Sequence, residues 1–154
     1  SYSEIEPAVS PDGRWIAYTS DETGRKEIRV RSFPEGPGRW QVSAQGGRYP
    51  RWSHDGRELY FEDDGPNSRM WVVGIEPAES FVYGSPAVLF ESLGGWSGFS
   101  EVGSSYDVAP DDQRFLIGYV GRVAGFGGDA GGAGGPNVVL VNNFFEELRR
   151  MVPE

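Results

Sequence analysis

Cysteine is absent from the 154-residue sequence, so neither disulfides nor thiolate metal ligands are available to it. His54 is the only histidine, which leaves a serine-type hydrolase a single candidate base, and that base falls in a tight turn. No apolar run approaches the length that spans a bilayer. The sequence therefore predicts no metal site, no cofactor and no membrane span in this segment.

Basic residues are few compared with acidic ones. The chain has 14 Lys and Arg against 23 Asp and Glu, a formal net charge of -9 that is spread along its length. Most faces would repel a phosphate backbone, so we expect no nucleic-acid partner. Hydrophobic residues make up 38% of the chain and aromatics 14%, which predicts a packed core and one domain over residues 1–154.

Three short stretches of the sequence share one pattern. They are SPDGRWIAY, SHDGRELYF and APDDQRFLI, which start at residues 10, 53 and 109. Aligning them puts Asp12, Asp55 and Asp111 in register at spacings of 43 and 56 residues, a range typical of propeller blades. Each stretch predicts a hairpin corner: proline presets φ, aspartate accepts backbone N–H bonds and glycine supplies a positive φ. The apolar runs that follow are typical of a sheet buried on both faces.

Two corners depart from this pattern. His54 stands where the other two corners have proline, and Asp112 stands where the other two have glycine. Aspartate tolerates the left-handed conformation less well than glycine. We therefore expect Asp112 to adopt a positive φ with some strain.

The predicted fold is all-β, with about three four-stranded antiparallel blades of a partial or half propeller and a short C-terminal helix. The predicted units are blade 1 at about 7–47, blade 2 at about 49–91, an inserted loop at 92–105, blade 3 at about 106–142 and the helix at about 143–152. The predicted strands are 8–10, 14–20, 27–33 and 39–43, then 51–53, 58–62, 70–75 and 87–91, then 107–109, 114–120 and 138–142. A fourth strand is missing from the third unit.

The corners resemble those of the TolB-like, WD-repeat-related β-propeller family. SPDGRWIAY fits the family corner fully, and the other two copies fit with one and two substitutions. The ending, YDVAPDDQRFLIG followed by NVVLVNNFFEELRR, is similar to the C-terminal end of propellers attached to bacterial serine/threonine protein kinases. The resemblance implies a binding propeller, carries over no catalytic residues and favours a periplasmic or extracytoplasmic location.

Motifs for catalysis or metal binding are incomplete. GGWSGF around Ser97 lacks the second glycine of a nucleophile elbow. EDDG at 62–65 lacks the alternating ligands of a calcium loop. The glycine-rich stretch 121–136 lacks the Lys-Ser/Thr ending of a phosphate-binding loop. We therefore predict that the chain is not an enzyme.

Any recognition surface is expected on the face that carries the connections between blades and between second and third strands. The candidate binding residues there are Arg48, Tyr49, Asp63, Asp64, Trp96, Phe99 and Glu101. The tryptophans on predicted strands, which are Trp15, Trp40, Trp52 and Trp71, are expected to pack between blades.

The predicted function is a non-catalytic binding or sensor propeller that mediates protein or ligand interactions within a larger TolB-like protein. The alternative is an accessory propeller domain of a prolyl-oligopeptidase-type hydrolase. Three blades alone would expose apolar flanks. We therefore expect either a homodimer, with the N-terminus at 1–6 completing the last blade of the other chain, or the remaining blades of a parent propeller.

Overall fold

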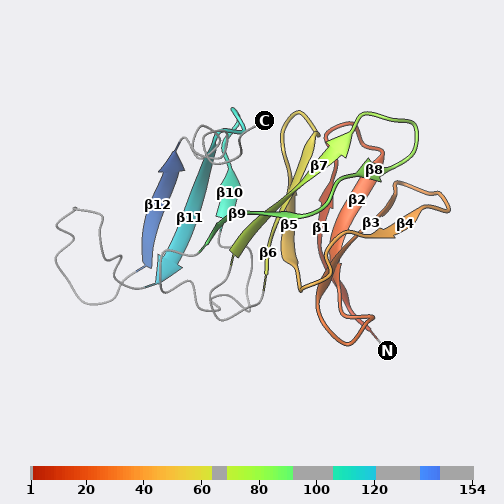
Figure 1. The fold of residues 1–154 in the computed structure, drawn as a ribbon, viewed down its shortest axis with the longest axis horizontal. Helices are drawn as coiled ribbons and strands as arrows, with labels where there is room; N and C mark the ends of the chain where they lie inside the picture. The colour runs from red at the N-terminus through yellow and green to blue at the C-terminus, as the bar shows by residue number, and fades with distance from the viewer. Residues whose placement is uncertain (1, 64–68, 92–105, 121–135, 143–154) are drawn as a thin grey trace.

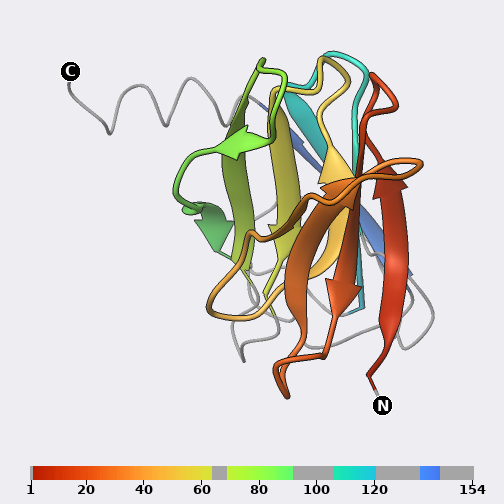
Figure 2. The same cartoon turned by 90° about the vertical axis from the view of Figure 1, so that its right-hand side faces the viewer.

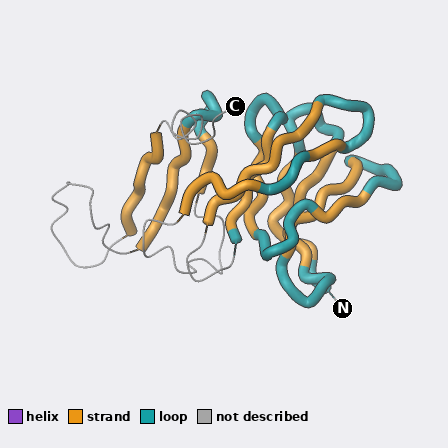
Figure 3. Tube along the Cα trace, viewed as in Figure 1, coloured by secondary structure: helices purple, strands orange, loops and turns teal. Residues whose placement is uncertain are grey.

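The structure is a computed structural model that describes residues 2–63, 69–91, 106–120 and 136–142 (Figure 1). These residues form strands and loops, with no helix among them (Figure 3). The strands are β1 (Glu4–Val9), β2 (Trp15–Ser20), β3 (Glu27–Ser32), β4 (Arg39–Gln41), β5 (Arg48–Trp52), β6 (Glu58–Glu62), β7 (Arg69–Glu76), β8 (Val82–Tyr83), β9 (Ala87–Glu91), β10 (Tyr106–Val108), β11 (Arg114–Val120) and β12 (Pro136–Asn142).

The strands form three antiparallel sheets, each corresponding to one predicted blade. Blade 1 has the order β1-β2-β3-β4, and blade 3 has the order β10-β11-β12. Blade 2 has the order β5-β6-β7, with both β8 and β9 paired to β7. The all-β fold of consecutive propeller blades is confirmed. The predicted C-terminal helix, the inserted loop and most of the glycine-rich stretch lie outside the described residues.

Several strand bounds differ from the prediction. Strand β5 begins at Arg48 rather than at residue 51, so Arg48 and Tyr49 belong to that strand. Strand β1 begins at Glu4, and Glu4 and Ile5 pair with Ser20 and Thr19 of β2. The start of the chain is therefore already part of blade 1, because a bulge lets β1 continue on the N-terminal side of Pro7. The short strand β8 was not predicted, since it consists of two residues paired to the end of β7.

Hydrogen bonds explain why the three corners fold alike. In the first, Asp12 accepts from the Arg14 amide at 3.0 Å and from the Ser10 hydroxyl at 2.6 Å, and Gly13 has φ 71°. The second corner repeats these bonds around Asp55, where Gly56 has φ 72°. In the third, Asp112 has φ 54°, as expected. The corners lie together at one end of the blades, opposite the N-terminus (Figures 1 and 2).

Blade 2 is buried on both faces because successive residues of β6 point into different cores. Leu59 and Phe61 belong to the hydrophobic cluster shared with blade 1, and Tyr60 belongs to the cluster shared with blade 3. Tyr60 meets Phe115 of blade 3 edge to face, with 4.9 Å between ring centroids. The expected sandwiching of a sheet between neighbouring sheets is confirmed for this blade.

Aromatic side chains hold blades 1 and 2 together. The four tryptophans predicted to pack between blades, which are Trp15, Trp40, Trp52 and Trp71, all lie in or against the first cluster. Phe81, from the loop between β7 and β8, is buried among them, with its ring centroid 5.4 Å from Trp15 and 5.1 Å from Trp40. The tryptophan prediction is confirmed, and Phe81 is the residue that it missed.

Candidate functional site

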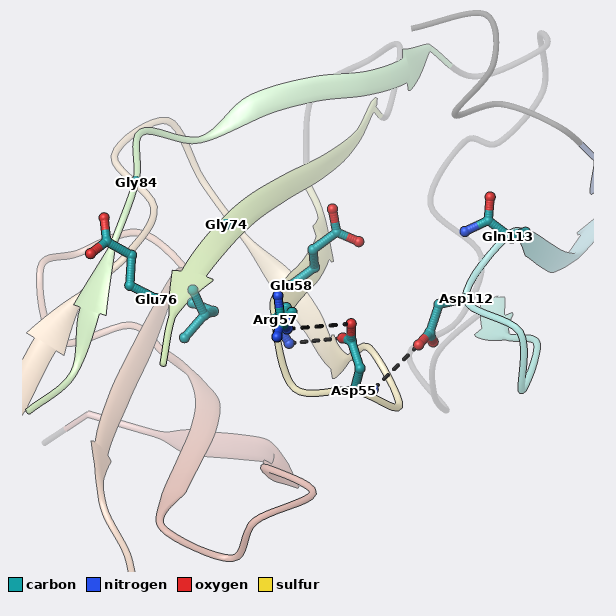
Figure 4. Close-up of a pocket in the computed structure, with 9 residues that line it drawn as sticks. Asp55, Arg57, Glu58, Gly74, Glu76, Gly84, Asp112 and Gln113 are labelled. Carbon is teal, nitrogen blue, oxygen red and sulfur yellow. Dashed lines mark hydrogen bonds and ion pairs between the residues drawn. The ribbon is translucent and has the colours of Figure 1, made fainter. Parts of the chain in front are cut away.

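A pocket of about 460 Å³ opens between the corners of blades 2 and 3 (Figure 4). Its lining consists of Asp55, Arg57, Glu58, Gly74, Ile75, Glu76, Gly84, Asp112 and Gln113. Because residues of two corners line it, the pocket lies at the end of the blades that carries the corners, and not on the face where we predicted recognition.

The hairpin structure of blade 2 places one wall of the pocket. The second corner turns the chain so that Asp55 and Arg57 precede β6, and Glu58 is the first residue of that strand. The Ile75 amide donates to the Arg57 carbonyl at 2.7 Å, which holds the end of β7 against the corner. The Gly84 amide donates to the Gly74 carbonyl at 2.9 Å and ties the β8 side to the same wall.

The two departures from the corner pattern meet at the other wall. The backbone amide of His54 donates to the Asp112 carboxylate at 2.8 and 3.0 Å, a bond that a proline at this position could not make. The His54 ring nitrogen Nδ1 lies 2.8 Å from the same carboxylate, and the Asp55 amide donates to it at 3.3 Å. Asp112 therefore fastens the third corner to the second, and its contact with Asp55 is visible in Figure 4.

Carboxylates dominate the electrostatics of the pocket. The lining contains four carboxylates, Asp55, Glu58, Glu76 and Asp112, and one arginine, Arg57, whose Nε lies 4.0 Å from the Asp55 carboxylate. The backbone amide of Arg57 and the Ser53 hydroxyl donate to Asp55 and hold its pKa below the usual range. The pocket consequently favours positively charged groups.

Glu58 is the first residue of β6 and is partly buried. Burial raises its pKa, and the negative charges of Asp55 and Asp112 raise it further, while the hydrogen bond from the Tyr60 hydroxyl, at 2.5 Å, opposes the rise. Burial and the Glu58 contact also raise the pKa of Tyr60 far beyond its ordinary value, so the phenol stays a donor. Glu58 is thus the lining carboxylate whose charge a cationic ligand would stabilise most.

We expect a Glu58→Gln variant to change how stability depends on pH. The folded state keeps the Glu58 proton to higher pH than the unfolded chain does, so unfolding releases a proton above the usual value of 4.5. The free energy of unfolding that Glu58 contributes therefore falls as the pH rises through this window. Glutamine still accepts from Tyr60 and has no charge to bury. Thermal melts should show the variant gaining stability over wild type between pH 4 and pH 7, and a constant difference would contradict the burial of this charge.

Tyr49, a predicted binding residue, has its backbone occupied by the neighbouring blades. It sits in a β5 bulge with φ 56°, and its side chain is buried. Its amide donates to Glu6 of blade 1 at 2.9 Å, and its carbonyl accepts from the Tyr106 hydroxyl of blade 3 at 2.6 Å. Arg48 donates to the Tyr49 hydroxyl at 2.8 Å. The structure therefore brings Arg48 and Tyr49 together as a link across three blades.

Asp63, also predicted for binding, is buried at the end of β6. Its carboxylate accepts from the Arg69 side chain at 2.7 Å and from the Trp71 indole at 3.0 Å. Burial alone would raise its pKa, but these bonds and one from the Arg69 amide hold the pKa below its usual range. Asp63 thus closes the β6–β7 hairpin.

The remaining predicted site residues, Asp64, Trp96, Phe99 and Glu101, lie outside the described residues. Within the described part of the chain, no group of three or more histidine or carboxylate side chains is placed to hold a metal ion. No segment among the described residues forms an apolar helix of membrane-crossing length.

Sequence reasoning missed the pocket residues Glu58, Glu76 and Gln113. Two signals pointed to this region, because His54 and Asp112 are two of the three departures from the corner pattern of the first copy. The contact between His54 and Asp112 joins two blades, and the spacing of the repeats does not predict it.

Comparisons with known proteins agree with the arrangement of the sheets. No protein-family model matches the sequence. No curated protein matches it either. Acylaminoacyl peptidase from Pyrococcus horikoshii matches in structure with a TM-score of 0.58 at 15% identity, over 93% of this chain and 23% of that one. The matched part is propeller. The fold is that of consecutive β-propeller blades.

Two further solved structures are similar over much of the chain. A Bacteroides uniformis protein assigned as a 6-phosphogluconolactonase matches with a TM-score of 0.50 at 15% identity, over 91% of this chain and 41% of that one. TolB from Acinetobacter baumannii matches with 18% identity over 92% of this chain and 41% of that one, but its TM-score of 0.43 is too low to carry an argument. The propeller segment thus spans well under half the length of these proteins, and such identities show the fold alone.

Proposed function

We propose that this propeller segment belongs to a non-catalytic module that binds a protein or ligand through the pocket between blades 2 and 3. The observation that supports the proposal most is the lining of that pocket, which contains four carboxylates and one arginine. A concave site with convergent polar groups, held on a rigid scaffold, is where binding usually occurs.

The chemistry of the lining favours binding over catalysis. Its nine residues include no serine, threonine, cysteine, lysine or histidine that could serve as a nucleophile with an adjacent base. Asp55 accepts from the Arg57 amide, and Asp112 accepts from the His54 amide, so both carboxylates are engaged in holding the corners. Ser53, beside the pocket, is buried and donates to Asp55.

The ligand that fits this lining carries a guanidinium or ammonium group. Glu76 is exposed at the end of β7, where its carboxylate is open to a charged partner. Glu58 lies deeper and pairs with Tyr60. A cation held by both would lower the energy of the Glu58 charge, whose burial is otherwise unfavourable.

Titration of the chain with a fluorescein-labelled peptide that carries two arginines tests the proposal. We expect saturable binding that weakens with added salt, and a Glu76→Gln variant should bind about two- to fivefold more weakly. Glu79→Gln is the matched control, because Glu79 is also exposed, on the adjacent loop, but lies outside the lining. Equal affinities for both variants, or no binding at all, would exclude this pocket as the recognition site.

A second candidate function is that of an accessory propeller domain of a prolyl-oligopeptidase-type hydrolase. The structural match to an acylaminoacyl peptidase favours it. Reading the coding sequence on both sides of the segment separates the two: an α/β-hydrolase domain supports the accessory role, and a kinase domain with a membrane span supports a sensor. An extracytoplasmic location, which the TolB-like resemblance favours, belongs with the sensor proposal.

A further inference from the structure

Both outer flanks of the three-blade segment present apolar side chains. On blade 1, Val9 is 45% exposed, and on blade 3, Leu116 is 48% exposed. Figure 2 views the blade 1 flank face on, and no other described strand lies in front of it. Single exposed apolar residues are ordinary on protein surfaces. These two are not scattered, as the register of the blades shows.

Equivalent positions in the second strands of the blades show which neighbouring blade each side chain faces. Counted from the corner aspartates, Ala17, Tyr60 and Leu116 are equivalent, each five residues on. Ala17 packs into the cluster shared with blade 2, and Tyr60 packs into the cluster shared with blade 3. Position five therefore faces the following blade, and Leu116 faces the place of a following blade.

The flank of blade 1 presents the opposite half of such a junction. Ile16, Leu59 and Phe115 are equivalent, each four residues after the corner aspartate. Leu59 packs toward blade 1 and Phe115 packs toward blade 2, so this position faces the preceding blade. Val9 is equivalent in the same way to Trp52 and Val108, which are both buried between blades. Ile16 and Val9 thus face the place of a preceding blade.

Polar groups on the two flanks are complementary as well. Arg31 is the register partner of Ile16, and its guanidinium lies 5.8 Å from the ring centre of Tyr18. The Tyr18 side chain is itself buried. On the other flank, Asp107 is exposed and is the register partner of Leu116. One flank therefore carries a cation beside its apolar residues and the other carries an anion.

We propose that the flank of blade 1 docks the blade 3 flank of a second copy of this chain. Tyr60 and Phe115 touch in the junction between blades 2 and 3. Leu116 is equivalent to Tyr60 and Ile16 is equivalent to Phe115, so one chain carries both sides of such a junction. Two copies related by a two-fold axis through the centre of the ring would bury both flanks in two identical junctions. The product is a closed ring of six blades, within the usual range of propellers.

Charge complementation between two variants tests the docking. Light scattering should find the wild-type chain as a dimer, and Leu116→Arg and Ile16→Glu should each give a folded monomer, because each puts an unpaired charge into both junctions. Mixing the two variants should restore the dimer, since one junction then pairs Arg with Glu and the other keeps the native Leu and Ile. Thr23→Arg, which adds the same charge to an exposed loop, should leave the wild-type dimer intact.

Each other outcome overturns the proposal. A wild-type chain that stays monomeric at high concentration shows that the flanks do not dock on each other. A dimer that survives Leu116→Arg uses a different surface, and failure of the mixed variants to associate shows that the two positions do not meet. Open-ended assemblies would exclude the closed ring. Circular dichroism of each variant confirms that loss of the dimer is not loss of the fold.

Discussion

Replacing Phe81 with alanine is expected to lower the free energy of unfolding by about 3–5 kcal/mol, the usual range for truncating a buried phenylalanine. Phe81 comes from blade 2 and fills the space between two tryptophans of blade 1, Trp15 and Trp40. It also lies 6.3 Å from Trp52 and 5.2 Å from Tyr83, measured between ring centroids. Its removal leaves a cavity between two rigid sheets that cannot collapse easily.

Urea unfolding followed by tryptophan fluorescence measures this loss, because three of the rings that surround Phe81 are indoles. Phe81→Leu should lose clearly less, since leucine fills most of the volume. Tyr2→Ala is the control, because Tyr2 is 53% exposed and its truncation removes little packing. If Phe81→Ala and Tyr2→Ala were equally mild, the aromatic cluster would not be what joins blades 1 and 2.

Glu27→Ala is expected to lower the free energy of unfolding by about 2–4 kcal/mol, because several donors lose a buried charged acceptor at once. Glu27 is 2% exposed, at the start of β3. One carboxylate oxygen accepts from the Ser43 hydroxyl and from the Gly46 amide at 3.2 Å. The other oxygen accepts from the Arg25 side chain at 2.8 Å. The side chain thus holds the connection between blades 1 and 2 against β3.

The same denaturation experiment checks this prediction. Glu27→Gln keeps one acceptor oxygen and should retain part of the stability, whereas Glu35→Ala, at an exposed loop position, should change it little. Limited proteolysis should cut Glu27→Ala faster between β4 and β5, where the lost bonds were. A variant as stable and as resistant as wild type would mean that Ser43 and Gly46 find other acceptors.

The strands that follow the corners were the most predictable part of the fold. Residues 58–62 and 114–120 were predicted with the bounds that β6 and β11 have, because corner chemistry sets where each strand begins and an apolar run sets its length. The start of β1 was missed because Pro7 interrupts its pattern, and only the bulge at Glu6, with φ 59°, explains how the strand continues. Such a bulge depends on pairing with β2, which local sequence does not show.

The candidate site was much less predictable than the fold. Asp63 was predicted as a binding residue on the recognition face, but its partners Arg69 and Trp71 lie on the next strand and hold the carboxylate in a buried position. The pocket itself forms where two corners 56 residues apart approach each other. The two corners come together because whole blades pack against each other, so neither residue type nor sequence spacing predicts the pocket.

The bond between His54 and Asp112 also bears on how a repetitive chain avoids misassembly. Blades with similar corners could stack in the wrong order, because each presents much the same surface to its neighbours. The corner of blade 1 has Pro11, which offers no amide hydrogen, and Gly13, which offers no carboxylate. Only the second corner can donate this bond and only the third can accept it. The pair therefore favours the packing of blade 2 against blade 3, because any other order of the blades lacks this polar contact.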